Sequence, residues 1–489
     1  MPWRTGHLSR GRFALISLTL AVTNFLMVFD GLVVTVALPA IQRSLGMDAL
    51  DAQWVLTAYT IPLGGMLLLG GRCGDRFGRR RVLVVGMGVF TAGLVGAGLA
   101  QATWMMLAAR ALQGFGSALA IPNTYALISA ISPVRRRHKA FAVVAVAGGG
   151  AAVCGAVIGG LVADTLGWRQ IFFLSAPLAI AAAVVAPRLL EPGRSHDGPQ
   201  RLDGVAAALS TGGLVLLVYA VTNLERAGLW SRSTVAAVAA AAALLGGYVL
   251  REWHARTPLL KPAMLRIRSL RAAIAGMPSQ VAAYVGTVFL GLLFFQQVRG
   301  YSALEAGLAF APLGVAAAVG SSAANRVLSA RHWALFAGGA GVLCTAGLLW
   351  LALAPVDGSY ATSYLPGLVL IGFGIVGAVP LNAAAGSEVP PGDKGTAYGL
   401  FETSTHISSA LVIACLATIA AVQARRSAPA GEVASLAAGY QLAFGITAGF
   451  ALIGAVVTVV LGLRADHSGR AALSASPDLP VGEPAAREG

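Results

Sequence analysis

The chain has 489 residues, of which 57% are hydrophobic and only 11% are charged, and 61 are glycine. Soluble domains carry about 25% charged residues, so this composition excludes an ordinary soluble protein and predicts one that crosses a membrane many times. The formal net charge of +15 does not indicate nucleic-acid binding, because the basic residues lie in alternate loops and form no stripe along one helix.

Apolar segments recur along nearly the whole chain, and each is long enough to cross a hydrocarbon core about 30 Å thick. The predicted spans are 13–40, 52–71, 82–101, 104–131, 140–163, 169–190, 204–224, 233–253, 270–298, 303–328, 332–355, 360–386, 395–421 and 440–463. The first apolar run is too long for a cleaved signal peptide, so we expect it to be retained. The predicted fold is an all-α integral membrane protein with 14 transmembrane helices.

The distribution of Lys and Arg sets the expected orientation. Basic residues concentrate in the N-terminal segment and in every second loop after it. The remaining loops hold only Arg43, Arg169, Arg226, Arg232, Arg299, Arg425 and Arg426. Because cytoplasmic loops carry the excess of Lys and Arg, we expect a multi-pass protein of the cell membrane with both termini in the cytoplasm.

Six spans lie on each side of a central pair. We therefore predict a cytoplasmic N-terminus at 1–12, a six-helix bundle at 13–190, a linker with two additional spans at 191–269, a second six-helix bundle at 270–463 and a disordered cytoplasmic tail at 464–489. Segment 321–326 occupies the place in the second half that 72–76 occupies in the first, with Asn325 where Asp75 stands. Related halves around a site at the membrane midplane are what a rocking transporter needs.

The loop at 71–81 reads GRCGDRFGRRR. Its glycines allow a tight turn between helices, Asp75 places one carboxylate at a helix end, and the basic cluster keeps the turn in the cytoplasm. The alternative is an ordinary basic membrane loop.

Two charged residues of opposite sign lie inside predicted spans. At 1.5 Å per residue, Asp30 lies about 13 Å inside the outer end of the first span, and Arg110 about 9 Å inside that of the fourth. A charge in the hydrocarbon region costs a few kcal/mol, so each should face a cavity or a partner. We expect the two to pair, directly or through water, across a central cavity. The alternative is a static ion pair that only joins two helices.

Glu402 and His406 are four residues apart in the thirteenth predicted span and therefore share a helical face. A histidine that titrates near neutral pH beside a carboxylate can relay protons. A structural pair that stabilises helix packing is an equally good interpretation. The residues expected to line a cavity for a drug-sized molecule are Tyr59, Gln113, Tyr125, Gln296 and Tyr398.

The chain lacks the motifs of several other classes of protein. Its four cysteines are scattered without a Cys-x-x-Cys spacing, which predicts neither a disulfide framework nor a metal site. The nucleotide-binding P-loop, the His-Glu-x-x-His motif and the Gly-x-Ser-x-Gly motif are all missing from the sequence. We therefore expect no cofactor and no enzymatic activity, and an energy source that is either a gradient or a partner protein.

Together these stretches resemble the fourteen-span drug:proton antiporter family of the major facilitator superfamily. The resemblance is carried by segments 30–39, 54–59, 71–81, 110–114, 167–172 and 300–307. It implies that Asp30 and Arg110 take part in proton coupling or substrate binding, and that a cytoplasmic gating loop is formed by Gly71, Asp75, Arg76, Gly78 and Arg79. It also implies an antiporter glycine helix with Gly149, Gly155, Gly159 and Gly160. Ala156 departs from the family pattern, which has proline there.

Glu402 and His406 belong to no family pattern and are assigned from their chemistry alone. The expected function is proton-coupled export of a hydrophobic or cationic small molecule, such as an antibiotic or another toxic compound, by alternating access. The expected partners are that substrate, protons and the lipid bilayer, with a monomeric protein and no nucleic acid. Proton-coupled uptake of a nutrient and a transport-inactive membrane sensor or scaffold are the alternatives.

Overall fold

The computed structural model describes residues 10–131, 151, 154–155, 157–190, 203–228, 230–255, 262–327, 333–389 and 394–474. All regular structure in these residues is helical. The helices of the first half are α1 (Arg10–Leu45), α2 (Ala49–Phe77), α3 (Arg79–Gly98), α4 (Thr103–Ile131) and α6 (Trp168–Leu189). The central helices are α7 (Gly204–Ala227) and α8 (Arg232–His254).

The second half begins with the short 3-10 helix η1 (Pro262–Arg266). Its long helices are α9 (Arg268–Leu293), α11 (Ala311–Val327), α12 (Trp333–Leu353), α15 (Lys394–Arg426) and α16 (Glu432–Ser474). Shorter pieces continue or join them: η2 (Phe294–Val298), α10 (Ala303–Ala309), η3 (Tyr360–Tyr364), α13 (Leu365–Gly374), η4 (Ile375–Gly377), α14 (Ala378–Ala385) and η5 (Ala428–Ala430).

Twelve helical segments of the described chain are long and apolar enough to cross a membrane. The predicted fourth span is the 29-residue helix α4, whose hydropathy is lowered by polar residues such as Arg110, Gln113 and Asn123. Much of the predicted fifth span lies outside the described residues. The all-helical membrane fold is thus confirmed, whereas the count of fourteen spans stays a prediction.

Two predicted boundaries are wrong. Helix α2 continues through Phe77 instead of ending at residue 71, because the glycines at 71 and 74 face α4 and do not break the helix. Helix α16 continues to Ser474, so residues 464–474 are helical where the sequence predicted a disordered tail. Alanine and leucine in that stretch favour a helix. Residues 475–489 lie outside the described chain.

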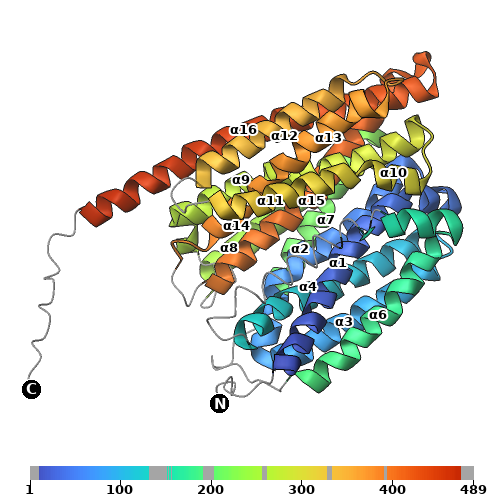
Figure 1. Cartoon of the computed structure of the whole chain (residues 1–489). Coiled ribbons are helices and arrows are strands. Elements are labelled where there is room, and N and C mark those ends of the chain that lie inside the picture. The colour runs from blue at the N-terminus through green and yellow to red at the C-terminus, as the bar shows by residue number, and fades with distance from the viewer. Residues whose placement is uncertain are drawn as a thin grey trace, which may run out of the picture.

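The helices form two groups, and α7 lies between them (Figure 1). In the first group α4 packs against α2 and α3, and α6 packs against α3 and α1. In the second group α16 packs against α9 and α12, and α13 packs against α12 and α11. Helices α7 and α8 pack on each other, and α7 also contacts α2 and α15. The boundaries of the two six-helix bundles stay a prediction.

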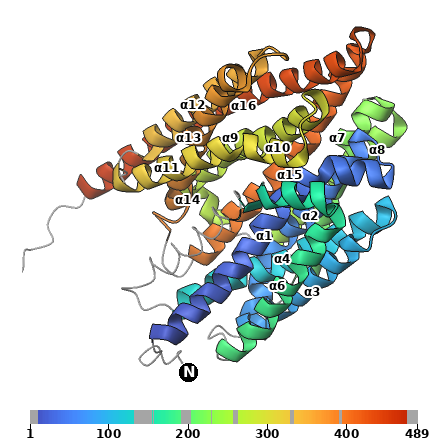
Figure 2. The same ribbon diagram turned by 45° about the vertical axis from the view of Figure 1, so that its right-hand side comes forward.

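The two groups meet at the end of the molecule near α10 (Figure 2). Gln296 Nε2, from η2, donates a hydrogen bond of 3.1 Å to the Val36 carbonyl of α1. The Asp164 carboxylate accepts hydrogen bonds from the backbone N–H groups of Ala303 at 3.2 Å and Leu304 at 2.9 Å. By the predicted topology this is the outer side of the membrane.

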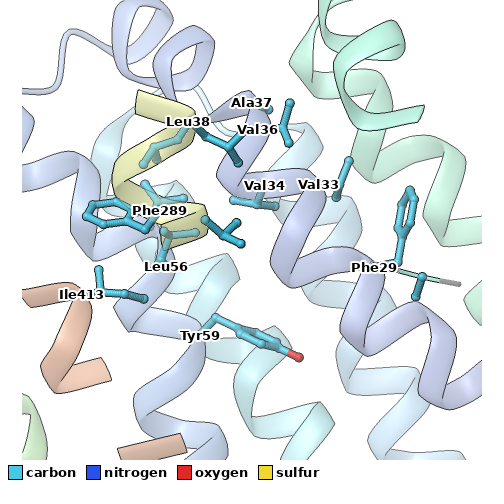
Figure 3. Packing of buried hydrophobic residues seen from close by; sticks show 14 of the residues in the cluster. Phe29, Val33, Val34, Val36, Ala37, Leu38, Leu56, Tyr59, Phe289 and Ile413 are labelled. Carbon is cyan, nitrogen blue, oxygen red and sulfur yellow. The ribbon is translucent and has the colours of Figure 1, made fainter. Parts of the chain in front are cut away.

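An apolar cluster lies behind these contacts (Figure 3). It joins Val34 and Leu38 of α1 and Leu56 of α2 to Phe289 of α9 and Ile413 of α15, all of them buried. Buried apolar side chains from both groups exclude water from this region. This end of the molecule, which the predicted topology places on the outer side, is therefore closed in this conformation.

Glycines allow α2 and α4 to cross closely. A Cβ at Gly114 of α4 would overlap the Tyr59 carbonyl oxygen of α2, and a Cβ at Gly70 of α2 would overlap the Ala118 carbonyl oxygen of α4. Backbone atoms cannot move aside as a flexible side chain can. The Gly114 position therefore fixes how α4 presents Arg110 and Gln113 to α1 and α2.

We expect Gly114→Ala to destabilise the protein by about 1–3 kcal/mol, which is the usual cost of forcing extra atoms into a packed interior. The melting temperature in detergent measures this effect. Gly88→Ala is the matched control, because a Cβ at Gly88 of α3 would have no atom within 4 Å. Equal melting temperatures for the two variants would contradict the proposed packing constraint.

Candidate functional site

The sequence predicts a contact between Asp30 and Arg110, and the structure contains it. Arg110 Nη1 lies 2.5 Å from Asp30 Oδ2, and the two side chains are 0% and 2% exposed. The expectation that they face each other across a central cavity is wrong for this conformation. The pair is enclosed by α1, α2 and α4, because the small residues of α4 allow these helices to close around it.

Several other groups hold the Arg110 guanidinium. Its Nε donates to the Val55 carbonyl of α2 at 2.9 Å, and its Nη1 also donates to Gln113 Oε1. The guanidinium carbon lies 4.6 Å from the centre of the Tyr59 ring, a cation–π arrangement. A buried charge is tolerated only with this kind of multiple support.

The arrangement also has spare hydrogen-bond donors. Within the described residues, Arg110 Nη2 and Gln113 Nε2 are buried and have no hydrogen-bond acceptor. A buried donor without an acceptor costs about 1–3 kcal/mol. A rearrangement that brings another acceptor to the pair would therefore recover free energy, so the pair is not a saturated, inert contact.

Two residues predicted to line a cavity belong instead to this buried cluster. Tyr59 is 5% exposed and Gln113 is 0% exposed. The Tyr59 hydroxyl lies 3.1 Å from Ser117 Oγ and donates to the Met27 carbonyl at 3.4 Å. Both side chains therefore position the ion pair and do not face a cavity in this conformation.

Glu402 and His406 share one face of α15, with His406 Nε2 3.9 Å from Glu402 Oε2. This distance is at the outer limit of an ion pair, and the histidine is charged only when protonated. The side chains are 35% exposed for Glu402 and 23% for His406, in contrast to the sealed Asp30–Arg110 pair. The structure thus contains one closed and one accessible pair of ionisable residues within its apolar helices.

Tyr125 of α4 lies within electrostatic range of Glu402, so this face of α15 points towards the first group of helices. The Tyr125 hydroxyl donates to Asn24 Oδ1 of α1 at 3.3 Å. Asn24 was not predicted from the sequence, although an amide within an apolar span is a detectable signal. Tyr125 and Tyr398 are 36% and 37% exposed, whereas Gln296 donates a hydrogen bond to the Val36 carbonyl of α1, and a cavity lined by these residues stays a prediction.

The predicted gating loop is mostly helical, and its turn consists of one residue. Gly78 has φ = +97°, a conformation that favours glycine, and separates α2 from α3. Arg79 Nη2 and Nε lie 2.9 and 3.1 Å from Asp75 Oδ1, and Arg79 Nη1 donates to the Ala126 carbonyl of α4 at 3.5 Å. These contacts join α2, α3 and α4.

Gly71 and Arg76 complete the predicted loop. A Cβ at Gly71 would lie 3.8 Å from Pro122 of α4, which is ordinary packing distance. The Arg76 guanidinium lies 5.4 Å from the centre of the Phe77 ring. A gating role for the loop remains a proposal.

The glycines of the fifth predicted span face two different helices. A Cβ at Gly155 would lie 3.0 Å from Leu32 Cβ of α1, and one at Gly159 would lie 2.5 Å from a Val33 methyl group. A Cβ at Gly160 would lie 2.6 Å from Leu304 Cα of α10. These glycines allow close backbone contact with α1 and α10. Gly149 and Ala156 lie outside the described residues.

No group of three His, Cys, Asp or Glu side chains in the described ranges is arranged to hold a metal ion.

The described chain is a multi-pass helical membrane protein with charged side chains held between its helices. Such an arrangement is typical of secondary transporters.

The protein belongs to the major facilitator superfamily, whose family model matches residues 20–413. Among curated proteins, it is 37% identical to the puromycin resistance protein pur8 of Streptomyces alboniger, covering 90% of this chain and 89% of that one. It is 35% identical to the cephamycin export protein CmcT of Amycolatopsis lactamdurans, covering 97% and 98%. It is 31% identical to the lincomycin resistance protein of Streptomyces lincolnensis, covering 82% and 83%.

Solved structures share the fold at lower sequence identity. The POT family transporter PepTSo superposes with a TM-score of 0.68 at 15% identity, covering 94% of this chain and 99% of that one. A bacterial homologue of the human lysosomal transporter Spinster, in an inward-facing and unoccupied conformation, gives a TM-score of 0.65 at 17% identity, covering 94% and 99%.

Proposed function

We propose that this protein exports an antibiotic or a related toxic small molecule from the cytoplasm. The observation that carries this proposal is similarity over nearly the full length to proteins of antibiotic resistance and export, at 37% and 35% identity. The cargo is a hydrophobic or cationic compound that enters between the two groups of helices. The protein acts as a monomer in the cell membrane with both termini in the cytoplasm.

The energy source in this proposal is the proton gradient. Proton uptake by a buried carboxylate changes its charge, and in a low-dielectric interior that change alters which helix contacts are stable. Asp30, held by Arg110, is the coupling carboxylate. Glu402 and His406 are more exposed, so they meet substrate and protons from the cytoplasmic side.

Alternating access requires the outer contacts to open when the inner side closes. The apolar cluster around Phe289 and the hydrogen bonds at Val36, Ala303 and Leu304 are the contacts that must separate. On the inner side, we propose that the segment Asp75–Arg79 takes part in closure. Its present contacts within the first group stabilise the short turn at Gly78.

Two experiments test this function together. A susceptible bacterial host expressing the protein is expected to gain resistance to a subset of a diverse antibiotic panel. Purified protein in proteoliposomes is expected to move protons when a compound from that subset is added. Uptake of the compound into cells along with protons would favour a nutrient symporter, and the absence of any transport would favour a sensor or scaffold.

Glu402→Gln is expected to lower substrate-dependent proton movement by about tenfold or more, because the side chain keeps its shape but can no longer ionise. Proton movement in proteoliposomes at several values of pH measures this effect. Glu432→Gln is the matched control, since Glu432 is an exposed residue in the first turn of α16. An equal, small effect of both changes would remove Glu402 from the mechanism and leave it a packing residue.

A further inference from the structure

Helix α7 lies between the two groups of helices and presents a different surface to each. A buried apolar cluster joins Ile61 of α2, Leu214 and Val218 of α7, and Ala410 and Ala414 of α15. Beyond this shared cluster, ion pairs and a buried hydrogen bond join α7 to α2, whereas a long hydrogen bond from Thr418 joins it to α15. This difference indicates which neighbour α7 and α8 accompany when the protein changes conformation.

Directional contacts join α7 to α2 near the outer ends of both helices. Arg226 Nη2 lies 2.6 Å from Asp48 Oδ2 and 2.8 Å from Asp51 Oδ1. One turn further in, Gln53 Nε2 donates to Thr222 Oγ1 at 3.1 Å, and this hydrogen bond is buried. A buried hydrogen bond between two helices fixes their relative position, since breaking it leaves unpaired polar groups.

The inner part of the same interface is also fixed. Ser210 Oγ of α7 donates to the Gly65 carbonyl of α2 at 3.3 Å. A Cβ at Gly65 would lie 3.1 Å from Thr211 Cα, so the two backbones are in close contact. Such contact leaves little space for one helix to slide along the other.

Charged residues join the inner end of α8 to the same surface. Arg72 of α2 interacts electrostatically with Glu252 of α8, which is 4% exposed, and with Asp203, the N-cap residue of α7. Asp203 also pairs with Arg251 of α8, whose Nε lies 2.9 and 2.7 Å from the two carboxylate oxygens. Burial alone would raise the pKa of Asp203. The hydrogen bonds from Arg251 and from the Ala206 amide outweigh it, so the pKa lies below its usual value.

The contacts of α15 with α7 and α2 are less directional than those between α7 and α2. Thr418 Oγ1 of α15 donates a long hydrogen bond of 3.4 Å to the Val221 carbonyl of α7. Towards α2, Gly64 faces His406 and Gly399 faces Leu68. These are van der Waals contacts, which are less directional than the hydrogen bonds and ion pairs that join α2 to α7.

We propose that α7 and α8 move as one body with α2 and the first group of helices, and that α15 moves across the surface formed by α2 and α7. This inference rests on the proposed alternating-access function. The two additional helices then extend the surface against which the second group rocks. They are not a flexible linker that follows both groups equally.

Two cysteine pairs test this inference in a protein whose four native cysteines are replaced by alanine. Gly65→Cys with Thr211→Cys joins α2 to α7. A Cβ at Gly65 would lie 3.2 Å from Thr211 Cβ, close to the 3.5–4.5 Å of a disulfide. Val221→Cys with Thr418→Cys joins α7 to α15. We expect oxidation of the first pair to leave the transport rate in proteoliposomes nearly unchanged, and oxidation of the second to lower it at least about tenfold, reversibly on reduction.

The opposite pattern would overturn the inference: loss of transport on joining α2 to α7, or full transport with α7 joined to α15. A failure of the proposed function gives a different result, since the reduced proteins would then not transport before any cross-link is made.

Spin-label distances test the same motion without transport. A label at Leu250 of α8 is paired with one at Val85 of α3 or one at Leu335 of α12, all three of which are exposed. On adding substrate or changing pH, we expect the distance from α8 to α3 to stay constant and the distance from α8 to α12 to change. A change in the first distance with a constant second distance would contradict the inference.

Discussion

Arg110→Ala is expected to abolish transport and to destabilise the protein. The change removes the partner of the Asp30 carboxylate, the donor to the Val55 carbonyl and the group that stacks on the Tyr59 ring. Removing one partner of a buried ion pair costs about 3–5 kcal/mol, because the other charge is left without compensation. If about 3 kcal/mol of this affects the rate-limiting conformational change, transport falls about 100-fold.

Substrate-dependent proton movement and the melting temperature measure these two effects. Arg110→Lys should recover transport only in part, because an ammonium group cannot reach Asp30, Val55 and Gln113 with the planar geometry of guanidinium. Arg232→Ala, at an exposed position in the first turn of α8, is the matched control and should leave both measurements unchanged. Full transport by Arg110→Ala would show that the residue has no part in the mechanism.

The second large effect is expected for Asp30→Asn. Asparagine keeps an oxygen that can accept from Arg110 Nη1, so the protein should still insert and fold. It cannot exchange a proton, however, and it leaves the guanidinium charge buried without a counterion, since arginine does not lose its proton in proteins. We expect substrate-dependent proton movement to disappear in proteoliposomes.

A double variant separates a structural role of the pair from a coupling role. Asp30→Asn with Arg110→Gln removes both charges, so the cost of an uncompensated buried charge is removed as well. We expect this variant to recover much of the stability lost in the single variants, because neighbouring changes in one network are not additive. Transport should stay absent if the pair couples proton movement. Restored proton-coupled transport in the double variant would leave the pair only a static link between α1 and α4.

The sequence predicts the ion pair because both residues are unusual at their positions. A charge in an apolar span is costly, and two charges of opposite sign at the same depth have few alternatives to pairing. The sequence does not show whether the pair faces water. That depends on the close crossing of α2 and α4 at Gly70 and Gly114, which brings Tyr59 and Gln113 against the guanidinium.

Some residues give no clear signal in the sequence. Glu252 follows a long run of alanine and leucine in α8 and looks like a charge at a helix end. The structure buries it near Arg72, which is far away in the chain. Asp164 likewise looks like a loop residue, although it caps the first turn of α10 in the other half. Both assignments depend on contacts between distant segments, which no local pattern contains.

The turn at Gly78 shows where local chemistry suffices. The glycine takes a positive φ, as the sequence suggests for a tight turn, and Asp75 pairs with Arg79 one helical turn away. The start of the turn was predicted wrongly, since glycine disfavours helices in water. In an apolar environment the backbone must satisfy its own hydrogen bonds, so α2 stays helical through Gly71 and Gly74.

Hydropathy and the cost of burying a charge can be read from local sequence. They are enough to predict that this protein is helical, crosses a membrane many times and holds a few ionisable residues in apolar helices. Helix packing, in contrast, is what buries Asp30 and Arg110 and leaves Glu402 and His406 partly exposed. The same packing places α7 between α2 and α15, with a buried hydrogen bond to α2 and a shared apolar cluster. The exposure and the contacts of a side chain depend on how the helices pack. That packing depends on contacts between segments that are distant in the sequence.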